Sequence, residues 1–408
     1  MRKSLPPELL LLVVELGSPD VQLVVRTLSK QFCALATPVA FRTLRCLNTP
    51  RSASGFLSIL DHTDLKDHVK NVVYYDVDGA REWYGQGGDM DDDEHIDLEY
   101  AAETDLSDAE EDELFVTLTE AFSRLHTLPS LNAISVTFPL GFYTFYPDFD
   151  DGILLSAYEA RVASVPELRI QLEILARLEV FATARYFASQ GLAPLRSLTI
   201  RNLNSFFNHR LSFSTFRRLF EGLTTLRLSI FTSIDATENV LIPSLTYFCT
   251  KTLPPLLRAC TSTLTSLTFQ LDQVFGHDVD LFLGDLHYPH LRQYLSLCSV
   301  LFSDATGIET LITSHAHTLR SLITSKCKID DVTKLLLLWS RVYARLGEAL
   351  TELVYLGVGV IPQGYVHLDP HGRWLLSTED IPVLKDDEAA LDVFLGIVAR
   401  RNATTHVY

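Results

Sequence analysis

The histidines are the first side chains in this sequence whose types and spacing could bind a metal. His367, Asp369 and His371 alternate in the segment HLDPH, and imidazole and carboxylate groups are common zinc ligands. The same alternation suits a turn in a loop rich in proline and glycine, and no further ligand is evident in the sequence. His315 and His317 alternate in the same way at a predicted helix end. We therefore predict no metal site.

Sequence motifs for catalysis or phosphate binding are missing. The chain has no G-x-S-x-G elbow, no G-x-x-x-x-G-K-[ST] loop and no G-x-G-x-x-G after a strand pattern. Isolated serine, histidine and aspartate residues are numerous, but a sequence alone does not align them into a triad. We expect a protein that is not an enzyme and needs no cofactor, and an enzyme in an α/β body is the weakest interpretation.

The cysteines do not form a recognisable metal or disulfide pattern. None belongs to a C-x-x-C pair and the spacing of all six is irregular: Cys33, Cys46, Cys249, Cys260, Cys298 and Cys327. This usage predicts buried free thiols in a reducing compartment.

The first residues resemble the start of a secretory signal peptide but differ from one in detail. The apolar run from Leu9 to Val14 is six residues, whereas such a peptide uses about 7–15. Pro6 and Pro7 precede it, no small-residue cleavage site follows it, and no run in the chain approaches the ~20 apolar residues that span a bilayer. We expect a chain without a membrane partner, in the cytoplasm and/or the nucleus.

The negative charge is concentrated in one segment. The formal charge is −17, and the segment from Asp89 to Glu113 has 14 acidic residues and no Lys or Arg, so the rest of the chain carries only −3. This balance argues against a nucleic-acid or anionic-membrane partner. We predict that residues 86–113 form a disordered insertion, because like charges repel and little apolar surface offsets the entropy of ordering. The alternative is a docking strip for a basic partner.

Two further segments are candidates for binding or modification. Ser107 has Glu110 three residues on and resembles a site for an acidophilic kinase, and a phosphate there would deepen the negative field. A run of aromatic residues predicts either a binding surface or a core beneath a long loop: Phe138, Phe142, Tyr143, Phe145, Tyr146 and Phe149.

Residues 1–48 predict a small module of three short helices. In the first helix, an i, i+3, i+4, i+7 pattern places four apolar residues on one face: Leu9, Leu12, Val13 and Leu16. Leu10, Leu11 and Val14 make its other side apolar as well, and a helix that is apolar all round must be buried all round. A module of ~45 residues cannot bury both faces alone. We expect another domain or another chain to cover the second face.

The segment LPPELLLLVVELGSPDVQLVVRTLSKQFCALATPVAFRTL (residues 5–44) resembles an F-box, the adaptor-binding module of SCF-type ubiquitin ligases. The likeness rests on Leu5-Pro6, Glu8-Leu9-Leu10, Asp20 and the phrase LSKQF from Leu28, and the tail LATPVAFRTL is similar to that of fungal F-box proteins. Leu28 stands where valine is common in the family, and Cys33 where a polar or basic residue is usual. The resemblance implies docking on a Skp-type adaptor, which links the module to a cullin and a RING subunit. Six positions would then form the adaptor face or the packing behind it: Leu5, Pro6, Leu9, Val13, Leu28 and Phe32.

The remainder of the chain, residues 49–408, carries a weak internal repeat. A short L-x-x-L-x-apolar strand phrase begins at eight positions: Val69, Leu131, Leu195, Leu223, Leu264, Leu291, Leu319 and Leu350. From Leu195 onward the spacings are 28, 41, 27, 28 and 31 residues, mostly near the ~20–29 of leucine-rich repeats. LRSLITSKCKI (319–329) fits best, with Cys327 at the position where that repeat has Asn or Cys. A half-buried strand of any α/β unit shows the same alternation, so the family match is degenerate.

These patterns predict an α/β chain in which a three-helix F-box module (1–48) precedes an irregular leucine-rich-repeat-like solenoid (49–408). The function this implies is that of a non-catalytic substrate receptor in a cullin-RING ubiquitin ligase, which bridges the adaptor and an unidentified target protein. The alternative is a scaffolding repeat protein whose F-box-like segment is an end cap without a role in a ligase.

Overall fold

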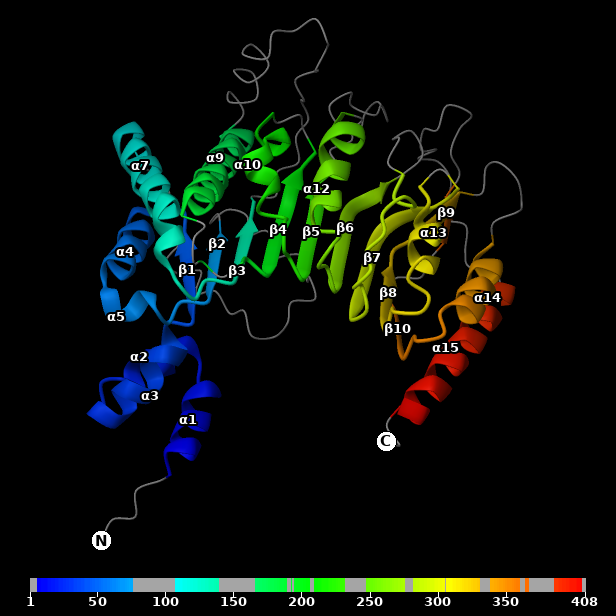
Figure 1. The fold of residues 1–408 in the computed structure, drawn as a ribbon, viewed down its shortest axis with the longest axis horizontal. Helices are drawn as coiled ribbons and strands as arrows, with labels where there is room; N and C mark the ends of the chain where they lie inside the picture. The colour runs from blue at the N-terminus through cyan, green and yellow to red at the C-terminus, as the bar shows by residue number, and fades with distance from the viewer. Residues whose placement is uncertain are drawn as a thin grey trace, which may run out of the picture. The chain divides into compact units, whose positions relative to one another are not determined.

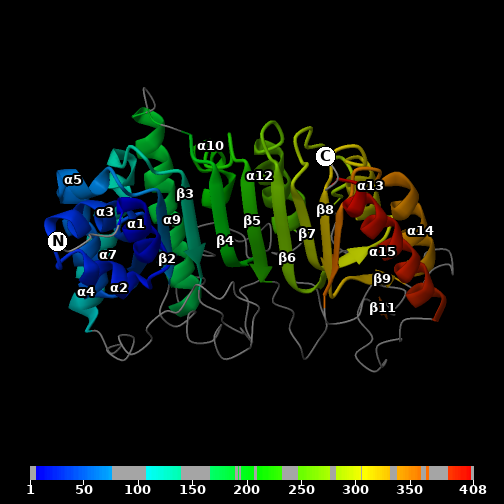
Figure 2. The same ribbon diagram turned by 90° about the horizontal axis from the view of Figure 1, so that it is seen from below.

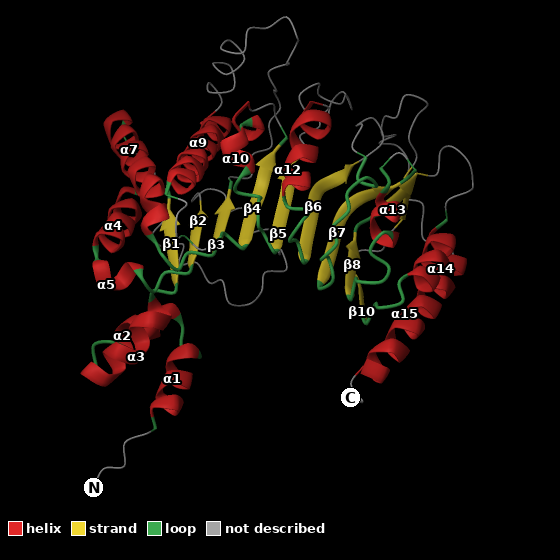
Figure 3. Cartoon of the chain, viewed as in Figure 1, coloured by secondary structure: helices red, strands yellow, loops and turns green. Residues whose placement is uncertain are grey.

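The computed structural model describes the following residues: 6–75, 107–138, 166–188, 192, 194–205, 209–231, 247–275, 282–304, 306–330, 338–359, 364–366 and 385–405. The chain divides into two compact units. The first unit comprises residues 1–140 and 173–197, and the second comprises residues 141–172 and 198–408. Both are of the α/β class with parallel strands, as the sequence predicts (Figure 3). HLDPH and the aromatic run beyond Phe138 lie outside the described residues.

The first unit begins with three short helices, α1 (Pro7–Glu15), α2 (Pro19–Val25) and α3 (Lys30–Ala40) (Figure 1). Proline opens α1 and α2, where its missing N–H is not needed. The side chains of Ser18 and Ser29 cap α2 and α3 by accepting a hydrogen bond from the backbone N–H of the third residue after each. The three helices pack on one another around side chains that include Leu10, Val14 and Ala36.

Three parallel strands follow in the first unit, in the order β1 (Thr43–Leu47), β2 (Asn71–Tyr75) and β3 (Ala133–Thr137). The other described helices of this unit are α4 (Pro50–Asp61), α5 (Thr63–Lys66), α7 (Asp108–Arg124) and part of α9 (Pro166–Phe187), with a short 3-10 turn, η2 (Leu125–Thr127). Sequence analysis did not predict β1, which begins three residues after α3.

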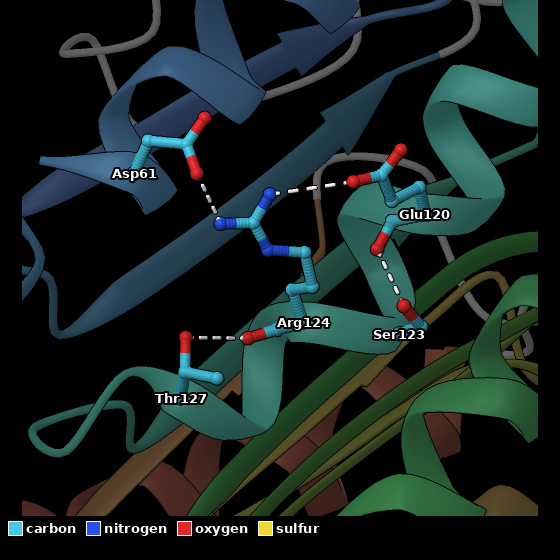
Figure 4. Close-up of polar contacts among 5 residues, drawn as sticks. All are labelled: Asp61, Glu120, Ser123, Arg124 and Thr127. Carbon is cyan, nitrogen blue, oxygen red and sulfur yellow. Dashed lines mark hydrogen bonds and ion pairs between the residues drawn. The ribbon is translucent and has the colours of Figure 1, made fainter.

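Helices α4 and α7 pack together, and an ion pair joins their surfaces (Figure 4). Arg124, at the end of α7, pairs with Asp61 of α4 and lies 3.4 Å from Glu120 of its own helix. Asp61 is largely exposed, so the pair contributes at most about 1 kcal/mol. The packing of buried side chains such as Phe56 and Phe122 accounts for most of the stability here.

Helix α7 corrects part of the prediction for the acidic segment. It begins at Asp108, so residues 108–113 are helical rather than disordered. Ser107 precedes the helix, and its backbone N–H and its hydroxyl both donate to Glu110 Oε2, at 2.9 Å and 2.7 Å. These two hydrogen bonds fix the start of the helix despite the repulsion among its acids. Residues 86–106 lie outside the described residues.

The strands of the second unit run in the order β4, β5, β6, β7, β8 and β10, and β9 and β11 pair beside β7. Their bounds are β4 (Ser197–Asn204), β5 (Thr225–Phe231), β6 (Ser266–Phe275), β7 (Tyr294–Phe302), β8 (Ser321–Ser325), β9 (Lys328–Asp330), β10 (Tyr355–Val358) and β11 (Gly364–Val366). The described helical segments of this unit are η3 (His209–Ser212), α10 (Ser214–Arg217), η4 (Phe248–Thr252), α12 (Leu253–Ala259), α13 (Ile308–Thr313), α14 (Trp339–Ala349) and α15 (Lys385–Thr405).

The eight predicted strand phrases overlap strands, but LTELVY (350–355) reaches β10 only at Tyr355. The alternation of the phrases fits the observed burial. In the second unit, one column of the sheet aligns leucines across neighbouring strands: Leu226, Leu267, Leu295, Leu322 and Leu356. The first four of these side chains are buried. An apolar side chain at every second position therefore builds a continuous core layer along the sheet.

The same backbone conformation recurs in β4, in β7 and directly after β8 in the second unit. Asn202, Ser299 and Lys326 have positive φ angles of 59°, 56° and 53°, and each lies four residues after a buried strand leucine. The residue after each is buried: Leu203, Val300 and Cys327. A left-handed residue is unfavourable for a side chain other than glycine, so its recurrence at one phase marks a shared structural unit.

Several connections that lead into strands are short, whereas the segments that leave strands vary from two residues after β1 (48–49) to much longer ones. Short segments precede β2, β3, β6 and β10: residues 67–70, 128–132, 260–265 and 350–354. Longer segments follow β2, β3 and β5: residues 76–107, 138–165 and 232–247. Since strands within each unit are parallel, the longer connections of a unit all leave from the carboxyl ends of its strands.

Helix α15 lies beside α14 in both ribbon views and holds the two ends of that helix (Figures 1 and 2). Near the start of α14, Asp387 of α15 accepts a hydrogen bond from the backbone N–H of Ser340 at 2.7 Å. At its other end, Arg401 donates to the carbonyl oxygens of Gly347, at 3.0 Å, and Leu350. A carboxylate at the amino end and a guanidinium at the carboxyl end both complement the helix dipole.

Candidate docking surface

The exposed apolar side chains of the described residues are concentrated on α1, α2 and the residues just after α2. Leu16 is 80% exposed and Leu28 is 63% exposed. The full set is Leu9, Leu12, Val13, Leu16, Val21, Leu23, Val24 and Leu28. Scattered apolar residues are normal on a protein surface, but a concentration of this kind marks an interaction surface. We call these eight side chains the docking surface.

The all-apolar sequence of α1 explains why this helix contributes to both the interior and the docking surface. Leu10 and Val14 are one helical turn apart and are buried against the neighbouring helices. Leu9, Leu12 and Val13 lie at other angles around the helix and remain exposed. The described residues therefore leave a second apolar face of α1 exposed, and the expectation that another chain covers it stays a prediction.

The predicted adaptor residues differ in their exposure. Leu9, Val13 and Leu28 are exposed members of the docking surface, and Pro6 is exposed where it precedes α1. Phe32 is half-buried at the start of α3, and its backbone N–H donates to Ser29 Oγ at 3.2 Å. Leu5 lies outside the described residues.

Five members of the docking surface were not among the predicted adaptor residues: Leu12, Leu16, Val21, Leu23 and Val24. Their signal was present in the sequence, since Leu12 and Leu16 share the helical face of Leu9. The family resemblance implied only the positions of the family motif, whereas the exposure of these five side chains depends on how α2 and α3 pack.

The docking surface can gain binding energy through apolar burial. A fully buried Leu or Val side chain contributes about 1.5–3 kcal/mol, and side chains that start about half exposed contribute roughly half of that each. Glu8 and Asp20, in the first turns of α1 and α2, favour the positive ends of their helices. The docking surface is therefore a candidate protein-binding surface.

The other predicted groups show no assembled reactive centre among the described residues. No cluster of three or more His, Cys, Asp or Glu side chains with metal-binding geometry occurs there. Burial raises the pKa of the Cys46, Cys260 and Cys327 thiols to about 12, so these thiols are poor nucleophiles. Ser107 is exposed, and its two hydrogen bonds to Glu110 lower the pKa of that carboxyl.

The two alternating histidines have different environments. His317 is exposed, whereas His315 is buried. His315 Nε2 accepts the backbone N–H of Tyr288 at 3.0 Å, and Nδ1 lies 2.7 Å from the carbonyl oxygen of Leu311, to which it donates. Burial lowers the pKa of His315. This histidine is a neutral structural group that joins α13 to the segment before β7.

Comparisons with known proteins assign no family to the chain. No protein-family model matches it, and the search of curated proteins found no match. Within the described part of the chain, every helix is too short or too polar to cross a membrane.

Proposed function

We propose that this chain is a non-enzymatic substrate receptor of an SCF-type cullin-RING ubiquitin ligase. The observation that carries the proposal is the docking surface, which occurs in the segment whose sequence resembles an F-box. Three short helices bury one set of apolar side chains and leave a second set exposed. A Skp-type adaptor would cover that second set.

The second unit supports the receptor role through its repeated architecture. Successive parallel strands align their leucines in one register. Three left-handed residues, Asn202, Ser299 and Lys326, each lie four residues after such a buried strand leucine. Cys327 Sγ lies 3.6 Å from the carbonyl oxygen of Leu297 on the neighbouring strand. A side chain that bonds to the backbone of the preceding repeat is what the Asn/Cys position of a leucine-rich repeat would supply. We interpret residues 49–408 as an irregular solenoid that presents a target protein.

The proposed mechanism is proximity. The receptor holds a target lysine near a ubiquitin-loaded conjugating enzyme and thereby raises its effective concentration, so no residue of this chain takes part in covalent chemistry. The chain therefore has to supply only binding energy, at one surface for the adaptor and at another for the target protein.

The test is co-purification of the full chain with a Skp-type adaptor, followed by substitution of exposed residues. Val13→Asp and Leu28→Asp should each reduce affinity at least 100-fold, because each removes an apolar contact and buries a carboxylate without a partner. Both side chains are more than half exposed, so the module should stay folded.

Val393→Asp is the matched control, since Val393 on α15 is 63% exposed and far along the chain from the docking surface. It should leave adaptor binding unchanged. The proposal fails if the wild-type chain does not bind the adaptor, or if Val13→Asp and Leu28→Asp bind as well as Val393→Asp.

The end-cap alternative makes a different prediction. A cap would bury its apolar face on the solenoid, whereas the eight side chains of the docking surface are exposed. The described hydrogen bonds of residues 7–41 all run within that segment or to its immediate neighbours. Removal of residues 1–41 should therefore leave the thermal unfolding of the rest of the chain unchanged, whereas the cap alternative requires the unfolding temperature to fall.

A further inference from the structure

A row of exposed cations crosses the amino ends of the strands in the first unit. The backbone carbonyl of Arg42 accepts from the N–H groups of Lys70 and Asn71, and that of Lys70 accepts from Asn132 and Ala133. The carbonyl of Asn132 in turn accepts from Arg196 and Ser197. Arg42, Lys70, Asn132 and Arg196 therefore occupy one register on neighbouring segments. We call Arg42, Lys70 and Arg196 the basic row.

The spacing of the basic row suits an extended acidic ligand. All three side chains are exposed, and Asn132 between them is half-buried. Neighbouring strands lie about 4.8 Å apart, so the row from Arg42 to Arg196 spans about 14 Å. That distance equals about four residues of an extended peptide. In a chain of formal charge −17, Arg42 and Lys70 are exposed cations at neighbouring register positions.

Exposed aromatic side chains occur at the end of α9, close in the chain to the basic row. Helix α9 ends at Phe187, nine residues before Arg196. Phe187 is 80% exposed and Tyr186 is 42% exposed, and their ring centroids are 5.3 Å apart. Aromatic residues of this kind are common anchors in protein interfaces.

Chain connectivity joins the basic row to the docking surface. Arg42 follows the end of α3 by two residues, and β1 begins at Thr43. A stable protein interface uses about 20–30 residues on each side, which is more than the eight side chains of the docking surface. A partner of ordinary size that covers α1 and α2 therefore has to contact residues beyond them, and Arg42 is close in the chain.

We infer that the basic row is a second, electrostatic part of the adaptor interface and that it binds an acidic segment of the same protein that covers the docking surface. The inference rests on the proposed function. Exposed charges of this kind act mainly on the rate of association and its salt dependence, whereas the apolar docking surface sets the rate of dissociation.

The experiment uses the full chain, a Skp-type adaptor and a fluorescent deca-glutamate peptide. At about 0.01 M salt, where the Debye length is ~30 Å, the double variant Arg42→Glu/Lys70→Glu should associate with the adaptor at least 10-fold more slowly than wild type. The difference should shrink to about twofold near 1 M salt. Wild type should bind the peptide, and the double variant should not.

The matched control is Arg258→Glu/Arg400→Glu, which reverses two exposed cations in the second unit with the same change of net charge. It should behave as wild type. If both double variants slow association equally, the effect is one of net charge and the inference is overturned. It is also overturned if deletion of residues 86–106 raises peptide affinity 10-fold or more, because the chain's own acidic segment would then occupy the row.

The two proposals fail in different ways. If wild type binds the adaptor and Arg42→Glu/Lys70→Glu leaves the rate and its salt dependence unchanged, the basic row has no part in the interface and the proposed function stands. If wild type does not bind the adaptor at all, the proposed function is wrong and so is the assignment of the basic row to that partner.

Discussion

Replacement of Asp387 by alanine should destabilise the end of the second unit by about 3 kcal/mol. The side chain is fully buried and accepts two hydrogen bonds, from the backbone N–H of Ser340 at 2.7 Å and from the hydroxyl of Tyr365 at 2.6 Å. The hydroxyl oxygen of Tyr365 accepts in turn from the backbone N–H of Trp339 at 3.1 Å. One carboxylate of α15 thus organises the start of α14 and strand β11.

The magnitude follows from the donors that alanine would leave unpaired. A buried donor without an acceptor costs about 1–3 kcal/mol, and alanine at position 387 removes the carboxylate that accepts from the Ser340 N–H and the Tyr365 hydroxyl. The desolvation of the charged carboxylate is relieved at the same time, which offsets part of this cost. Asp387→Asn keeps one acceptor oxygen of the same shape, so it should cost only about 1–2 kcal/mol. The expected order of stability is wild type, then asparagine, then alanine.

Tryptophan fluorescence during urea unfolding measures this effect locally. The chain has three tryptophans, so Trp83→Phe and Trp374→Phe leave Trp339 as the reporter. Trp339 is buried, and its ring lies 5.4 Å from that of Tyr343. The control is Asp392→Ala, at an exposed position on α15, the helix that also carries Asp387. It should change the free energy of unfolding by less than about 0.5 kcal/mol. Equal unfolding midpoints for Asp387→Ala and Asp392→Ala would refute the reasoning, as would an asparagine variant less stable than alanine.

Two further predictions concern titratable side chains. Because burial lowers the pKa of His315 below the ~6.5 of an unfolded chain, the unfolded state takes up its proton first, and stability should fall as the pH drops from about 7.5 to 5. His315→Gln should reduce that slope in urea midpoints measured against pH, and an unchanged slope would contradict the assignment. In the native chain, an alkylating reagent followed by mass spectrometry should label only Cys33 and Cys298, which are half-buried. Early labelling of any of the other four would show that its burial is wrong: Cys46, Cys249, Cys260 and Cys327.

The strands could be predicted from the sequence better than the elements between them. A phrase such as LTSLTF places alternate apolar side chains on one face of a strand, and it becomes β6 because that face packs into the core layer. Strand β1 was missed because its five residues follow a helix directly and its buried positions are only Leu44 and Cys46. Two buried positions carry too little periodicity to outweigh the helical pattern before them.

Helix α15 and the docking surface show what requires tertiary information. The apolar residues that α15 buries include Phe394 and Val398, but the neighbouring Val393 and Leu395 are apolar and exposed. The helix pattern therefore does not single out a buried face without the partner helix α14. Its key polar residue, Asp387, is an ordinary helix-start acid in the sequence. For the docking surface, periodicity predicted two apolar faces on α1, but only packing decides that Leu10 faces inward and Leu12 outward.

The unequal connections have a consequence for how chains of this design can diverge. Closing a longer loop costs only about 0.6 kcal/mol for each doubling of its length, so segments that leave the carboxyl ends of strands can accept insertions without a change of register. The segments that enter strands have no such freedom, because they supply a buried leucine and the shared backbone hydrogen bonds that align each strand with the next. Mutation can thus change the length and sequence of the segments at the carboxyl ends of the strands over generations. The amino ends of the strands, together with the helices attached to them, keep a constant geometry.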